Sequence, residues 1–341
     1  MAGAGRPDPD LPEADAAPTL SVRGLSTEFR AGGRVRRVVD DVSFDVKRRE
    51  ILAFVGESGS GKSVTFLSVL RLIADPPGRI VDGSVLFDGE DLMTLDPKGA
   101  RMRSIRGGGI GFVFQEPMTS LNPVLTIGRQ IMESLRLHLD MGRREARARA
   151  AGLLSAVGIG DAERRLGAYP HEFSGGMRQR IMIAIAVACS PRLIIADEPT
   201  TALDVTTQAQ ILELLAGTVR DLGASLVLIT HNLGIVARYA DRINVMYAGR
   251  IVESGATDDV FADPRHPYTR ALLDCVPRLG ETRKLAPIAG QPPDAGTAFA
   301  HCPFLPRCAR ALPVCRTAPP PRLADVAPNH SAACHAAELP E

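Results

Sequence analysis

Short apolar runs recur along the chain between polar and glycine-rich stretches. Three of them, residues 51–55, 193–196 and 225–229, consist almost wholly of strand-forming side chains. Runs of four or five residues with this character predict strands buried on both faces of a parallel sheet. We therefore expect an α/β fold with these strands at its centre.

Other segments have different periodicities. Residues 20–55 alternate apolar and polar positions around Gly32-Gly33 and predict antiparallel strands. Residues 63–73 and 206–222 carry apolar side chains at helical spacing, and the second segment joins two of the apolar runs as a βαβ unit. Residues 122–172 are rich in Arg, Ala, Leu and Glu, which predicts a helical insertion.

Composition divides the chain of 341 residues. Residues 1–19 are rich in Ala, Pro and Asp, and we expect a disordered tail. Beyond Pro264 the periodicity fades and Pro and Gly become frequent, so we place a boundary near Arg278. The expected organisation is a main domain over 20–278 and a small C-terminal cysteine-rich module over 279–341.

Charge and hydropathy exclude several classes of protein. The formal net charge is only +1, so the overall charge does not indicate a nucleic acid partner. The N-terminus lacks the basic start and apolar stretch of a signal peptide. Every apolar run falls far short of the roughly 20 residues needed to cross a bilayer. We expect a cytoplasmic location, where the six cysteines would be reduced thiols or metal ligands.

A glycine-rich loop follows the first apolar run and opens the first predicted helix. Its residues are Gly56, Glu57, Ser58, Gly59, Ser60, Gly61, Lys62 and Ser63. Strand, loop and helix in this order predict a site for the phosphates of ATP, with backbone N–H groups and the helix N-terminus facing the anion. Lys62 would contact the β- and γ-phosphates, and the Ser63 hydroxyl would ligate Mg²⁺.

Four further polar residues follow buried strands. Asp197 and Glu198 end the run at 193–196, and we expect Asp197 to hold Mg²⁺ and Glu198 to act as general base on the attacking water. Gln115 follows residues 110–114 and is expected to reach the metal and the water. His231 follows residues 227–230 and is expected to bond the γ-phosphate. Parallel strands would bring these side chains to one sheet edge.

Together these motifs resemble the ATP-binding subunits of ABC transporters over residues 20–255. The matching motifs are a Walker A motif at Gly56 to Ser63, a Q-loop at Gln115, a signature at Ser174, Gly175, Gly176 and Met177, a Walker B motif at 193–198, a D-loop at 202–204 and a switch histidine at His231. The resemblance implies a P-loop NTPase of ABC type, with a RecA-like core, an antiparallel β subdomain and a helical insertion. It also implies a head-to-tail dimer in which the signature of one subunit binds ATP held by the other.

Two positions depart from the usual signature, Phe173 in place of Leu and Met177 in place of Gln. Met lacks an amide, so any side-chain hydrogen bond at this position is lost. Phe29 lies where the family places an aromatic ring that stacks on adenine, and a core strand aromatic is the alternative interpretation.

Four segments resemble the corresponding sequences in the ATPases of bacterial dipeptide and oligopeptide importers, namely residues 114–123, 173–180, 246–253 and 266–273. This resemblance implies two transmembrane permease subunits, a second ATPase subunit, a periplasmic or lipid-anchored substrate-binding protein, and a place at the cytoplasmic face of the membrane. Alternative cargoes are nickel chelates, glutathione and short sugars. The alternative classes are a soluble ABC ATPase of DNA repair or translation and a redox sensor.

The C-terminal cysteines are Cys302, Cys308, Cys315 and Cys334. A core-poor segment with four thiols suggests a metal that contributes to folding. The resemblance implies a [4Fe-4S] cluster, which Cys₄ ligation suits, with Zn²⁺ as the alternative. Further candidate ligands are His301, His330 and His335.

Overall fold

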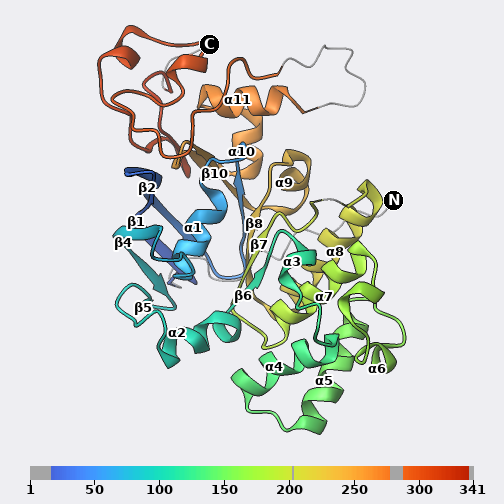
Figure 1. The fold of residues 1–341 in the computed structure, drawn as a ribbon. Coiled ribbons are helices and arrows are strands. Elements are labelled where there is room, and N and C mark those ends of the chain that lie inside the picture. Colours follow the sequence, from blue (N-terminus) through green and yellow to red (C-terminus); the bar gives the residue numbers. More distant parts are fainter. Residues whose placement is uncertain (1–16, 202, 277–286, 338–341) are drawn as a thin grey trace.

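The computed structural model describes residues 17–201, 203–276 and 287–337, which form two sheets and the helices around them (Figure 1). The smaller sheet is antiparallel and has the strand order β2-β1-β4-β5. Its strands are β1 (Leu20–Ala31), β2 (Arg34–Val46), β4 (Gly78–Phe87) and β5 (Glu90–Asp91). Gly32 and Gly33 turn the chain between β1 and β2 with positive φ angles of 56° and 73°, as their sequence predicts.

The larger sheet has the order β11-β12-β10-β9-β3-β8-β7-β6. Its central strands β6 (Ile110–Val113), β7 (Leu193–Asp197), β8 (Ser225–Ile229), β3 (Ile51–Val55) and β9 (Arg242–Tyr247) are mutually parallel. All residues of β3, β7 and β8 are buried, which explains their continuous apolar sequence. The predicted parallel α/β core is confirmed.

Alternate residues of the central strands point to opposite faces of the sheet and pack in different cores. Leu52 and Phe54 pack with α1 (Lys62–Val69) and the antiparallel sheet. Ile194 and Ala196 point to the opposite face and pack with α7 (Gly175–Val187) and α8 (Val205–Leu222). The two helices that begin at the glycine-rich loop and at the signature therefore cover opposite faces of one sheet. Helix α1 ends at Val69, before residue 73 where the sequence predicts its end, because Arg71 adopts a left-handed φ of 52°.

The insertion at 122–172 is helical, as predicted. It contains α4 (Ile127–Leu139), α5 (Arg143–Ala156), α6 (Ala162–Arg165) and a 3₁₀ turn at Pro170–Glu172. Helix α4 buries Ile127, Ile131 and Leu135, which lie four residues apart on one face. Shorter helical elements, α2 (Ala100–Ser104), the turn Ile105–Gly109 and α3 (Pro117–Ser120), flank β6.

The C-terminal part does not stand apart as a separate cysteine-rich module. Helix α9 (Leu233–Tyr239) joins β8 to β9. After β10 (Arg250–Ala256), the helices α10 (Thr257–Ala262) and α11 (Pro267–Asp274) are followed by β11 (Ala324–Ala327) and β12 (His330–Ala332), and β12 pairs with β10. Phe304 is buried against Tyr247 and Tyr268, with ring centroids 5.3 and 5.4 Å away. These residues therefore extend the main sheet and share its core, a long-range pairing that composition does not reveal.

Two predictions lie outside the described residues, namely the tail over residues 1–16 and the boundary near Arg278. Thr19, the last residue of the predicted tail, is buried, and its hydroxyl hydrogen-bonds that of Ser225 at 3.1 Å. Across residues 17–201, 203–276 and 287–337, no helix combines the length and the apolar character that crossing a membrane requires.

Candidate active site

The glycine-rich loop joins β3 to α1 and is held close to neighbouring backbone. Gly56 has φ 149°, and a Cβ there would lie 2.2 Å from the carbonyl oxygen of Met246. Gly61 has φ 102° and is the N-cap of α1. A side chain at either position would strain the backbone or collide with it, so the glycines are required by the path of the loop. That path presents N–H groups and the start of α1 together, as a phosphate site needs.

Lys62 lies inside this loop and is 5% exposed. Its ammonium donates hydrogen bonds to the carbonyl oxygens of Gly56 at 2.7 Å and Glu57 at 3.0 Å. Burial lowers the pKa of Lys62, and the nearby carboxylates of Glu198, Asp197 and Glu57 oppose that shift. A desolvated ammonium placed beside the loop amides is suited to bind phosphate oxygens.

Ser63 and Asp197 meet as the sequence predicts. The Ser63 hydroxyl donates to Asp197 Oδ1 at 2.9 Å, which joins the first turn of α1 to the end of β7. Burial raises the pKa of Asp197, and the hydrogen bond from Ser63 opposes only part of this rise. A hydroxyl and a carboxylate at one point fit Mg²⁺, which takes one or two protein carboxylates together with substrate phosphates.

Glu198 is the centre of the polar cluster. Gln115 Nε2 donates to its carboxylate at 3.2 Å, His231 Nδ1 lies 3.3 Å from it, and Thr201 Oγ1 donates at 2.9 Å. The strands β6, β7 and β8 precede Gln115, Glu198 and His231, and their carboxyl ends lie side by side because they are parallel neighbours. Three predicted residues are thus brought together. Thr201 was missed, and its position one turn after Glu198 is the signal that could have found it.

The signature residues lie away from the polar cluster around Lys62 and Glu198. Ser174 is the N-cap of α7, and its hydroxyl accepts a hydrogen bond from the N–H of Met177 at 3.4 Å. Ser174 and Gly175 are exposed, and α7 covers the opposite face of the sheet from α1 (Figure 1). The signature therefore forms a second, exposed helix N-terminus rather than part of the site around Lys62. In the predicted D-loop, Asp204 caps α8 by accepting from Thr207 N at 3.0 Å, and Ala202 lies outside the described residues.

Phe29 is half-buried in β1. Its ring packs against the start of β4, since a Cβ on Gly78 would lie 2.8 Å from it. This contact accounts for the ring as a strand aromatic, and stacking on adenine stays a prediction.

The sequence does not predict a contact between the glycine-rich loop and Arg307 in the C-terminal part of the chain. The guanidinium of Arg307 forms two hydrogen bonds to the carboxylate of Glu57, at 2.7 and 2.9 Å, and its side chain is 3% exposed. The two residues are 250 positions apart, so no local pattern indicates the pair.

The four C-terminal cysteines do not form the predicted metal site in this structure. Burial raises the pKa of Cys334 to about 11, so its thiol is protonated at neutral pH. Among the residues the structure describes, no three His, Cys, Asp or Glu side chains are grouped to hold a metal ion. Metal ligation needs thiolates at bonding distance, so neither [4Fe-4S] nor Zn²⁺ is supported.

The three candidate histidine ligands have other partners. His330 Nε2 lies 2.8 Å from the buried carboxylate of Glu253. His301 bonds the carbonyl oxygen of Ala318 at 2.9 Å, and His335 bonds that of Pro319 at 3.3 Å.

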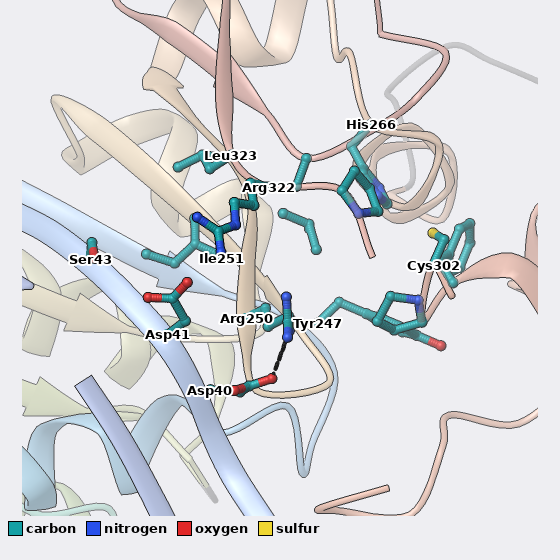
Figure 2. A pocket seen from close by; sticks show the side chains of 15 residues that line it. Asp40, Asp41, Ser43, Tyr247, Arg250, Ile251, His266, Cys302, Arg322 and Leu323 are labelled. Atoms are coloured by element: carbon teal, nitrogen blue, oxygen red, sulfur yellow. Dashed lines mark hydrogen bonds and ion pairs between the residues drawn. The ribbon is translucent and has the colours of Figure 1, made fainter. Parts of the chain in front are cut away.

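A cavity of about 260 Å³ opens where β2 and β10 meet the C-terminal residues (Figure 2). Arg250 bonds Asp40 in this cavity, and Cys302 and Arg322 also line it. None of the residues predicted from the phosphate-binding motifs lines it. The cavity is therefore separate from the candidate catalytic cluster around Glu198.

A phosphate loop, a carboxylate pair after a buried strand and a separate signature helix define an ATP-hydrolysing domain of the ABC class. A family model described as ABC transporter matches residues 39–201, and one described as oligopeptide/dipeptide transporter, C-terminal region, matches residues 252–315. A protein of Brucella melitensis described as a peptide import ATP-binding protein is 52% identical over 329 residues, covering 93% of this chain and 96% of the relative. The chain belongs to the family of ABC transporter ATP-binding proteins, and it is an ATPase.

Other relatives agree. A peptide ABC transporter ATP-binding protein of Sinorhizobium fredii is 50% identical, covering 95% of this chain and 96% of its own length. The dimeric structure of MJ0796, a bacterial ABC transporter cassette, has a TM-score of 0.62 at 29% identity and covers 70% of this chain and 98% of that one. CbiO1 of Clostridium perfringens, part of an ABC transporter complex, has a TM-score of 0.60 at 27% identity, covering 72% and 91%.

Proposed function

We propose that this ATPase energises the import of dipeptides and oligopeptides across the cytoplasmic membrane. The observation that carries the proposal is the match of residues 252–315 to the C-terminal region of oligopeptide and dipeptide transporters. Relatives about half identical over nearly the whole chain and described as peptide import ATP-binding proteins support it. Nickel chelates, glutathione and short sugars are the alternative cargoes that an experiment must separate.

The proposed chemistry follows from the arrangement around Glu198. Lys62 and the loop amides bind the phosphates, and Glu198 takes a proton from the water that attacks the γ-phosphate. Gln115 and His231, both in contact with Glu198, orient the water and bond the γ-phosphate. Mg²⁺, held by Ser63, Asp197 and Gln115, would neutralise charge on the phosphate oxygens.

We further propose that the active unit is a dimer. The support is the exposed N-terminus of α7 on the face of the sheet opposite α1, where Ser174, Gly175 and Gly176 have no phosphate of their own chain to bind. In a head-to-tail pair they would complete the partner's site with helix N–H groups. The dimeric state of MJ0796 agrees with this proposal.

The remaining proposed partners are two transmembrane permease subunits and a periplasmic or lipid-anchored substrate-binding protein. The chain would lie at the cytoplasmic face, with the helical insertion at 122–172 docked on the permease. Closure of the dimer on ATP would then drive the permease between inward-open and outward-open states.

Uptake measurements test the proposed cargo. Deleting the gene is expected to abolish uptake of labelled dipeptides and oligopeptides, and the wild-type chain is expected to restore it whereas Glu198→Gln is not. Uptake of labelled nickel chelate, glutathione and maltose in the same strains is expected to be unchanged. If the deletion abolished uptake of one of these compounds and left peptide uptake unchanged, the proposed cargo would be wrong, while the assignment as an ATPase would stand.

Metal at the four cysteines stays a prediction. Its basis is the sequence, which places four cysteines within residues 302–334, and not the arrangement of the described side chains. Iron in anaerobically purified protein, lost in Cys308→Ser, would favour a cluster, and stoichiometric zinc would favour Zn²⁺. Protein that folds with neither metal would remove both interpretations.

A further inference from the structure

Glu57 joins the phosphate loop to two residues of the C-terminal half of the chain, Tyr268 and Arg307. Its N–H donates to the hydroxyl of Tyr268 at 2.8 Å, and its carboxylate accepts both hydrogen bonds from Arg307. Its carbonyl oxygen accepts a hydrogen bond from the Lys62 ammonium at 3.0 Å. One loop residue thus links the C-terminal residues directly to the lysine that faces the phosphates.

Arg307 is built into this position. It ends the 3₁₀ turn Leu305–Arg307, and its guanidinium lies 5.9 Å from the ring centroids of both Tyr247 and Phe304. It also donates to the Tyr247 hydroxyl at 3.4 Å. Hydrogen bonding to Glu57 raises the pKa of Arg307, so the cation persists at any physiological pH. A planar, two-bond fork between aromatic rings fixes the orientation of the Glu57 carboxylate.

A second segment of the C-terminal part lies over the same loop. Residues 292–296 and Phe299 face residues 57–60 across a gap of about 10 Å³. Gly296, with φ 76°, packs so closely on β2 that a Cβ would lie 2.3 Å from the Cβ of Arg36. C-terminal residues therefore lie beside the loop as well as bonding to it, while Ser58 and Gly59 stay exposed.

We propose that Arg307 is a positioning residue of the ATP site: by holding Glu57, it keeps the phosphate loop and Lys62 in the conformation that binds ATP. The C-terminal residues are then part of the ATPase, and a displacement of the turn at Leu305–Arg307 would weaken nucleotide binding. The inference rests on the ATP site and is independent of the transported molecule.

The expected kinetic effect depends on whether the Arg307–Glu57 contact stabilises bound ATP, the transition state of hydrolysis, or both. Lys62 and the loop bind phosphates before and during hydrolysis, so a disordered loop loses affinity in both states. Loss of the pair is expected to raise the Kd and KM for ATP and leave kcat nearly unchanged. A roughly tenfold rise lies within the range typical of coupling between sites.

The experiment uses the full-length chain. ATP binding is measured with a fluorescent ATP analogue, hydrolysis by phosphate release, and folding by the melting temperature, for Arg307→Gln, Arg307→Lys, Glu57→Gln and the double variant Arg307→Gln/Glu57→Gln. The matched control is Arg316→Gln, an exposed arginine in the next 3₁₀ turn. We expect roughly tenfold weaker ATP binding in Arg307→Gln, partial rescue in Arg307→Lys, and no change in Arg316→Gln.

The double variant separates positioning from attachment. If Arg307 acts through Glu57, the double variant binds ATP no more weakly than either single variant. The proposal is overturned if Arg307→Gln lowers only the melting temperature while the folded protein binds ATP normally, or if the two single effects add. Failure of the wild-type chain to bind ATP would instead reject the ATP site itself.

Discussion

The sequence predicts one site around Glu198 and another at the four C-terminal cysteines, yet among the described residues only the first forms a hydrogen-bonded cluster. Gln115, Thr201 and His231 contact its carboxylate at 2.9 to 3.3 Å. The cysteines, by contrast, are not grouped to hold a metal ion in the part of the chain that the structure describes. The difference lies in the scaffold, because Gln115, Glu198 and His231 follow the ends of parallel strands, whereas the cysteines lie in loops and a 3₁₀ turn. Functional residues at the ends of parallel strands are therefore the more predictable set.

The largest expected effect tests the Glu198 cluster. Glu198→Gln keeps the size of the side chain but removes the base, so we expect hydrolysis to fall by about 10²- to 10⁴-fold with ATP binding retained. Steady-state phosphate release and equilibrium binding of ATP check this. Glu163→Gln, at a carboxylate that is 68% exposed, serves as the control and should leave both unchanged. Near-normal hydrolysis in Glu198→Gln would reject Glu198 as the base.

Gly56→Ala tests the loop that carries Lys62. A Cβ 2.2 Å from the Met246 carbonyl oxygen forces the loop to move, so we expect loss of ATP binding and a destabilisation of about 1–3 kcal/mol. Gly217→Ala in α8 is the matched control, since a Cβ there meets nothing within 4 Å, and it is expected to raise stability by about 0.5–1 kcal/mol. Denaturant unfolding and ATP titration measure both variants. An ATP affinity for Gly56→Ala equal to that of wild type would contradict the prediction.

The C-terminal half should instead respond to pH. Burial lowers the pKa of His266 to about 4, and its Nδ1 accepts a hydrogen bond from Tyr268 N at 3.0 Å, so the folded chain keeps the neutral ring. The unfolded chain binds a proton below about pH 6.5, so this contribution is complete above that pH and is lost as the pH falls towards 4.

We expect His266 to account for a loss of up to about 3 kcal/mol in unfolding free energy over that interval. Denaturant unfolding at pH 7, 5.5 and 4 measures it. His266→Asn keeps an N-cap acceptor and should show a smaller loss, while His171→Gln, at an exposed histidine, should follow wild type. Equal slopes for His266→Asn and wild type would remove His266 as the cause.

The smallest expected effect concerns the signature. Met177 contributes its backbone N–H to Ser174 rather than its side chain, so Met177→Gln should change the ATPase rate by less than about twofold. Phosphate release by the full-length chain checks this, with Ser174→Arg as the disruptive comparison expected to abolish hydrolysis. A large gain in Met177→Gln would show that the usual amide has a role in this chain as well.

Much of the fold and the catalytic cluster could be predicted from local sequence. The apolar runs at β3, β7 and β8 mark buried strands, and the polar residues that follow them must meet because the strands are parallel. The metal prediction at the cysteines lacked such a constraint, since four thiols within 33 residues say little about distances between loops.

The amino-acid order alone carries the phosphate loop, the carboxylates after β7 and the signature, because each depends on neighbours within a few residues. Three-dimensional packing alone determines that α1 and α7 cover opposite faces of the sheet, that β12 joins β10, and that Arg307 reaches Glu57. Those contacts join segments far apart in the chain, and their partners are selected by shape and charge after folding rather than by spacing.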